Sequence, residues 1–123
     1  MKAFTDIEQS KKLAEILPLE SADMSYPYDR HLNKMYGDIP YVIGYKKINK
    51  DIDIPCWSLA ALLKILNETA YFMDEDASVN LSSYKTIEWD LGIDNSDLEL
   101  ATESNPIDAC YEMIIKLKEQ NLL

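Results

Sequence analysis

Few residues of this 123-residue chain are suited to catalysis. His31 is the single histidine, and it stands beside Arg30 in a stretch without regular periodicity. A general base, a Cys–His pair or a histidine-based metal site would need this residue. The patterns GxSxG, GxGxxG, GxxxxGK[ST], CxxC and HExxH do not occur in the sequence. We therefore predict no catalytic residue. A small enzyme or ligand-binding module that uses His31 and nearby carboxylates stays open as an alternative.

Acidic clusters offer oxygen ligands for a hard cation. In the segment DEDASVN, residues 74–80, Asp74 and Asp76 fit two positions of a calcium loop. Such a loop also needs a glycine at its sixth position and a glutamate at its twelfth. Val79 occupies the glycine position. The sequence therefore predicts no metal ion and no other cofactor.

The cysteines and the apolar runs indicate where the protein acts. Cys56 and Cys110 lie far apart in apolar surroundings, as free buried thiols do in a reducing cytosol. A disulfide in an exported protein is the alternative, but the N-terminal MKAFTDIEQSKK lacks the apolar region of a signal peptide. The longest apolar run, residues 59–63, is far shorter than the roughly 20 residues of a membrane-spanning helix. We expect a cytoplasmic protein without a membrane segment.

Negative charge is concentrated in the second half of the chain. Residues 1–64 hold nine acidic and nine basic residues, whereas residues 65–123 hold thirteen acidic and three basic residues. Such a surface repels nucleic-acid phosphates and attracts a basic protein. The alternative is a solvated face that only maintains solubility. The candidate partner-binding acids are Glu88, Asp90, Asp94, Asp97, Glu99 and Glu103.

Residues 18–40 follow no regular period for long and are predicted to be irregular. Tyrosines crowd into the overlapping stretch 24–45. Five of the eight tyrosines lie there, and Tyr26, Tyr28 and Tyr36 are the candidate contact residues. Tyrosine combines a large apolar ring with a polar tip, which favours protein interfaces. The alternative is a loop that its own rings pin to the body of the protein.

Three segments have helical periodicity. In 5–17, Thr5 and Glu8 have the spacing of a capping box, and the expected apolar face joins Ile7, Ala14 and Leu17, with Leu13 at its edge. Residues 57–66 follow Pro55 and are apolar nearly all round, which predicts a central helix that is buried nearly all round. Ser58 is expected as its N-cap or first-turn residue, and the Trp57 indole N–H is expected to reach a polar partner.

The third helix begins at Asn105, with Pro106 at the first helical position and Asp108 in the first turn. Its predicted apolar face holds Ile107, Cys110, Ile114 and Leu117.

Between the last two helices the period changes to two. Residues 71–73 resemble a short strand, and alternation over 79–82 and 86–91 predicts an antiparallel meander with Glu88 and Asp90 on its outer face. A short strand is also expected over 41–45, and a polar loop with one helical turn over 92–104. The predicted fold is one α+β domain over residues 1–123, with three helices and a small antiparallel β-meander.

Three segments together resemble a known group of proteins: FTDIEQSKKLAEILPLESADMSY (4–26), IPCWSLAALLKIL (54–66) and NPIDACYEMIIKLKEQNLL (105–123). They are similar, in the same order, to small uncharacterised proteins encoded by phages, prophages and other mobile elements of gut Bacteroidetes. The resemblance covers about half of the chain and implies an intracellular protein expressed in a bacterial host. It implies no activity and assigns no site residue.

These observations favour a non-enzymatic accessory protein that binds another protein. The acidic half would act as an anti-defence decoy, competing for the basic groove of a host nucleic-acid-binding protein. Alternatively, the tyrosine-rich loop and the exposed helix faces would serve a homo-oligomer or a partner encoded by the same element. No direct binding to nucleic acid or membrane is expected.

Overall fold

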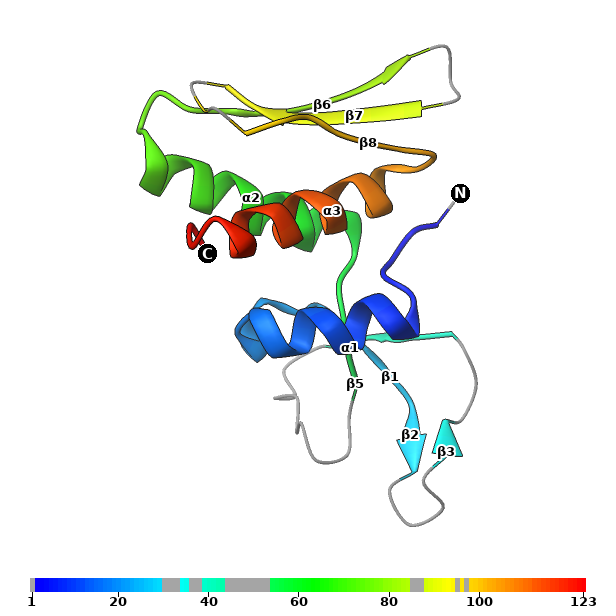
Figure 1. The fold of residues 1–123 in the computed structure, drawn as a ribbon. Coiled ribbons are helices and arrows are strands. Elements are labelled where there is room, and N and C mark those ends of the chain that lie inside the picture. Colours follow the sequence, from blue (N-terminus) through cyan, green and yellow to red (C-terminus); the bar gives the residue numbers. More distant parts are fainter. Residues whose placement is uncertain are drawn as a thin grey trace. The chain divides into compact units, whose positions relative to one another are not determined.

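The computed structural model of the chain describes residues 2–29, 34–35, 39–43, 54–84, 88–94, 96 and 98–123. Its helices and short antiparallel sheets confirm the α+β class (Figure 1). Two compact units make up the chain. The N-terminal unit is Phe4–Ala61, and the C-terminal unit joins Met1–Ala3 to Leu62–Leu123. That residues 1–123 form one domain stays a prediction.

The N-terminal unit is built from helix α1 (Ile7–Ile16) and a short 3-10 helix, Leu19–Ser21. Its strands are β1 (Met24–Tyr26), β2 (Tyr28–Asp29), β3 (Lys34–Met35), β4 (Tyr41–Val42) and β5 (Ile54–Cys56). Strands β4, β1 and β5 pair in that order, β2 pairs with β3, and all pairs are antiparallel. Helix α1 packs on β5. The strand expected over 41–45 is therefore found at Tyr41–Val42.

The cap of α1 lies one residue later than predicted. Asp6 is the N-cap: its carboxylate accepts from the Gln9 amide at 2.8 Å, and the Asp6 amide donates to Gln9 Oε1 at 3.1 Å. Thr5 cannot serve as the cap because its side chain is engaged with other buried groups, described below. Of the predicted apolar face, Leu13 and Leu17 are buried, whereas Ile7 and Ala14 are half-buried. Gln9 and Ser10 of α1 are also buried.

Helix α2 (Leu59–Met73) begins as predicted but ends later. The Ala61 amide donates to Ser58 Oγ at 3.2 Å, and Asp23 accepts from the Ser58 amide at 2.9 Å, which caps the helix. The expected end at residue 66 and the expected strand at 71–73 are wrong. The i, i+4 series of Leu62, Leu66 and Ala70 is fully buried and continues the helix past them.

Burial of α2 is one-sided, which corrects the expectation of burial nearly all round. Its exposed residues recur at helical spacing: Ala60, Lys64, Asn67, Glu68, Tyr71 and Phe72. Trp57, just before the helix, is fully buried, and its indole N–H donates to Ser21 Oγ at 3.0 Å as expected.

The C-terminal unit contains the predicted meander. Strand β6 (Val79–Tyr84) pairs with β7 (Glu88–Ile93), and β7 pairs with β8 (Ala101–Glu103), all antiparallel. The loop predicted over 92–104 therefore contains the third strand of the sheet, which is too short to show a two-residue period in the sequence. The region 18–40, predicted as irregular, similarly hides strands of two or three residues.

Helix α3 (Pro106–Glu119) begins as predicted. Asn105 caps it by accepting from the Asp108 amide at 2.9 Å, and Pro106 stands in its first turn. The predicted face of Ile107, Cys110, Ile114 and Leu117 is fully buried. Helix α3 packs on β7 and β8, and α2 and α3 lie on the same side of this sheet (Figure 1). The other side is its outer face.

Candidate functional site

The outer face of the β6–β7–β8 sheet is polar and acidic. Successive side chains of a strand point to opposite faces, so Leu91 and Ile93 of β7 point inward and are buried, whereas Glu88 and Asp90 point outward. The register places Ser82 of β6 and Thr102 of β8 on either side of Asp90. The predicted outward position of Glu88 and Asp90 is therefore found.

The predicted partner-binding acids divide into two groups. Glu88, Asp90 and Asp94 follow one another along the outer side of β7 and its end, with Glu88 and Asp94 exposed and Asp90 half-buried. Glu103 has the opposite orientation, because its register partner is Trp89 on the inner side. Glu99 is exposed in the segment before β8, and Asp97 lies outside the described residues. The outer face thus gathers half of the predicted set.

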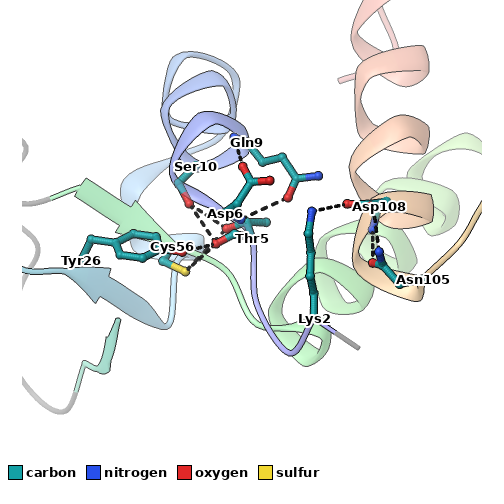
Figure 2. A network of polar contacts seen from close by, with 9 residues as sticks. All are labelled: Lys2, Thr5, Asp6, Gln9, Ser10, Tyr26, Cys56, Asn105 and Asp108. Carbon is teal, nitrogen blue, oxygen red and sulfur yellow. Dashed lines mark hydrogen bonds and ion pairs between the residues drawn. The ribbon is translucent and has the colours of Figure 1, made fainter. Parts of the chain in front are cut away.

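Little positive charge offsets these carboxylates. The C-terminal unit carries thirteen acidic and five basic residues, a net charge of −8, and the N-terminal unit carries nine and seven, a net charge of −2. Within the described part of the C-terminal unit, the one ion pair joins Lys2 Nζ to Asp108 Oδ1 at 2.7 Å, at the start of α3 (Figure 2). Another lysine, Lys116, donates to the backbone carbonyl of Leu100 at 3.0 Å. Glu88, Asp90 and Asp94 take part in no ion pair between described residues.

Of the three predicted tyrosine contacts, the structure describes the side chain of Tyr26, which is buried. Tyr26 is 1 % exposed, and its hydroxyl donates to the Thr5 carbonyl at 2.7 Å. Its ring also meets Phe4 edge-on, with the ring centres 6.4 Å apart. For Tyr26 the structure matches the alternative, in which the ring pins its segment to the body. The backbone of Tyr28 belongs to β2, and the Tyr28 side chain and Tyr36 lie outside the described residues.

A pocket of about 200 Å³ lies on the outer face, which the sequence did not reveal. Its lining residues are Asn80, Ser82, Asp90, Gly92, Ile93, Asp94, Leu98 and Leu100. Gly92 stands between Asp90 and Asp94, and a Cβ atom there would lie 2.5 Å from Leu100 Cδ2. A side chain at residue 92 would therefore displace Leu100. The only signal in the sequence is this glycine within a strand, which often marks a close approach.

A second groove lies in the N-terminal unit. It has a volume of about 460 Å³ and is lined by Lys11, Ala14, Leu17, Pro18, Leu19, Ile54 and Pro55. The described part of its lining is mostly apolar, and Lys11 is the charged residue within it. None of these described residues carries a carboxylate, thiol or hydroxyl group.

A buried polar network surrounds Thr5 in the N-terminal unit (Figure 2). The Thr5 and Ser10 hydroxyls share a hydrogen bond of 2.8 Å, and Thr5 Oγ1 accepts from the Trp57 amide at 3.1 Å. Cys56 Sγ donates to the Thr5 carbonyl at 3.4 Å, and Tyr26 donates to the same carbonyl. The network joins the residues before α1 to β1 and β5, so its hydroxyl groups are used for folding.

Both cysteines are buried free thiols, as predicted. Burial raises the pKa of Cys56 above its ordinary value, opposed by hydrogen bonds from Thr5, Ser10 and Tyr26. Burial alone raises the pKa of Cys110 to about 12. The reactive form of cysteine is the thiolate, so neither side chain is a nucleophile near neutral pH.

Searches of the described residues find no group of three or more metal-binding side chains. No helix in the described ranges is long and apolar enough to cross a membrane. His31, on which the catalytic alternative depends, lies outside these ranges.

Comparisons of the chain with protein-family models, curated proteins and solved structures find no match in any of the three. What the outer face does must therefore be inferred from its own residues.

Proposed function

We propose that this protein binds a basic partner protein through the outer face of the β6–β7–β8 sheet. The observation that carries the proposal is the row of Glu88, Asp90 and Asp94 on the sheet face opposite α2 and α3 (Figure 1). Uncompensated carboxylates attract a positively charged surface and accelerate the encounter with it.

The partner that fits best is a nucleic-acid-binding protein of a bacterial host. Its basic groove is shaped for a row of phosphates, and the acidic row on β7 would compete for the same groove. The resemblance to small proteins of phages and mobile elements of Bacteroidetes supports this setting. The protein would then act inside the host cell as a non-enzymatic, anti-defence decoy.

The test uses host proteins that heparin retains from an extract of a gut Bacteroidetes strain. The immobilised wild-type chain should capture a defined protein from this fraction, and duplex DNA should displace it. Capture should be lost at about 0.5 M salt, where charges on a surface are screened beyond about 4 Å. The triple variant Glu88→Gln, Asp90→Asn, Asp94→Asn should not capture it.

The matched control removes the same charge from the N-terminal unit. Glu8, Glu15 and Glu20 are exposed there, and their replacement by glutamine also changes the net charge from −10 to −7. This variant should capture the partner as the wild type does. Equal capture by the wild type and the β7 triple variant, or capture that persists at 0.5 M salt, would refute the proposal.

Self-association is a second candidate, and one observation favours it. Ile39 and Val42, beside and within β4, are 76 % and 74 % exposed, and β4 is at the edge of its sheet among the described strands. An edge strand can pair with the same strand of a second copy. Light scattering at several protein concentrations separates the two candidates, since a mass of 14.1 kDa throughout would exclude the homo-oligomer.

A further inference from the structure

We infer that the pocket beside Gly92 binds the side chain of one arginine or lysine of the partner. This inference rests on the proposed function, because it names the residue of the partner that anchors the complex. A volume of about 200 Å³ lies below the roughly 300–1,000 Å³ of pockets that hold drug-sized ligands. A single side chain is an occupant of suitable size.

The lining of the pocket is complementary to both parts of a cationic side chain. Leu98 and Leu100 provide apolar surface for the hydrocarbon stem. Asp90 and Asp94 provide negative charge for the head, and Asn80 and Ser82 add neutral polar groups. None of the described lining residues is basic.

Each aspartate keeps an oxygen for a ligand. Asp90 Oδ1 accepts from Thr102 Oγ1 at 2.7 Å, and Asp94 Oδ2 accepts from Ser78 Oγ at 3.0 Å. In the described structure, the other oxygen of each carboxylate accepts no hydrogen bond. These two bonds fix the carboxylates on the sheet while leaving acceptors for a guanidinium or an ammonium group.

The apolar wall of the pocket is also held in place. Ser96 Oγ donates to the Ile93 carbonyl at 2.8 Å and accepts from the Leu98 amide at 3.3 Å. Lys116 holds the Leu100 carbonyl from α3. Because Gly92 has no side chain, the Leu100 side chain can pack closely on the β7 backbone between the two aspartates. A pocket that exists before binding loses less entropy when its ligand enters.

The test follows the backbone amides of the chain by NMR during titration with Nα-acetyl-arginine amide. We expect saturable shifts at Gly92, Asp94 and Asn80 in the millimolar range, the weak end of affinities. The neutral citrulline analogue, which has nearly the same shape, should cause none. Asp94→Asn should weaken binding by about tenfold, the loss expected for a hydrogen bond between charged groups.

A matched pair of variants separates the pocket from the general acidity of the face. Ser82→Phe fills the pocket and leaves the net charge unchanged, so it should abolish the shifts. Ser83→Phe places the same ring on the neighbouring, also exposed residue of β6, which points to the other face, and should leave them intact. Dispersed spectra of both variants establish that they are folded.

Two results would overturn the inference. One is the absence of saturation, or shifts spread evenly over exposed acids such as Glu75 and Glu119. The other is an unchanged titration of the folded Ser82→Phe variant. Either result leaves the proposed function standing if the wild type still captures the host protein and the β7 triple variant does not. The failure of the inference and the failure of the proposed function are therefore distinguishable.

Discussion

The two units of this chain bury different kinds of side chain. The fully buried side chains described in the C-terminal unit are apolar, among them Leu91, Ile107 and Leu117. The unit carries a net charge of −8, and none of its described acidic residues is buried. The buried polar residues described in the protein all belong to the N-terminal unit: Thr5, Gln9, Ser10 and Ser25. Buried polar groups require hydrogen-bond partners, whereas exposed ones do not.

This difference separates the residues that fold the protein from those available for function. In the N-terminal unit, the hydroxyl groups that could do chemistry are committed to one another around Thr5. In the C-terminal unit, the acids on the outer side of β7 lie outside the buried core, with Glu88 and Asp94 exposed and Asp90 half-buried. A partner-binding surface is therefore expected on the C-terminal unit.

The largest effect should come from the apolar core of the C-terminal unit. Leu117→Ala removes a fully buried side chain of α3 and should lower the free energy of unfolding by about 2–5 kcal/mol. Leu122→Ala is the matched control, because Leu122 is 41 % exposed, and it should cost less than about 0.5 kcal/mol. Equal costs in urea titrations would contradict the placement of α3 against the sheet.

A smaller change in stability should distinguish the two units when the same substitution, threonine to valine, is made once in each of them. Thr5→Val keeps the shape but removes the acceptor of the Trp57 amide and the hydroxyl that bonds Ser10, while Ser10 keeps the Thr5 carbonyl at 3.5 Å; we expect a cost of about 1–3 kcal/mol. Thr102→Val removes an exposed hydroxyl that binds Asp90 and should cost less than about 0.5 kcal/mol. Thermal or urea unfolding measures both. Similar costs would remove the contrast between a buried polar network and a solvated sheet face.

The smallest effect should appear in how the free energy of unfolding of the wild type and of two cysteine variants depends on pH. The pKa of Cys110 is raised to about 12 in the folded chain, against 9.0 when unfolded. Its stabilising contribution is therefore complete below pH 9 and is lost as the pH rises toward 12. Between pH 8 and 10, the free energy of unfolding of the wild type should fall by roughly 1 kcal/mol more than that of Cys110→Ala.

Cys56→Ala is the comparison from the other unit. In the wild type, hydrogen bonds of the Cys56 thiol with Thr5, Ser10 and Tyr26 oppose the rise in the pKa of Cys56 that burial causes. The wild type and this variant should therefore differ less in their pH dependence than the wild type and Cys110→Ala. Urea titrations at pH 8 and 10 measure both differences. A larger difference for Cys56→Ala than for Cys110→Ala would show that the polar network does not limit the rise in the pKa of Cys56.

Long periodic segments were predictable from the sequence. The third helix was predicted with its cap at Asn105 and its buried face, and the alternation along 86–91 predicted the outward side of β7. These features follow from local rules, since helix caps and strand alternation depend on neighbouring residues. The one-sided burial of α2 was not predictable from 57–66, because Lys64 is the only charged residue there and the other polar residues of the exposed face begin at Asn67.

The amino-acid sequence by itself determined the α+β class, the free cysteines and the concentration of negative charge after residue 64. The tertiary structure alone decided which carboxylates share a face. Glu88, Asp90 and Asp94 are brought together by strand direction and register, whereas Glu103 is turned away by its pairing with Trp89. Tertiary pairing also placed Leu100 over Gly92. Such contacts join residues that no local period relates, so only the folded chain could show the pocket.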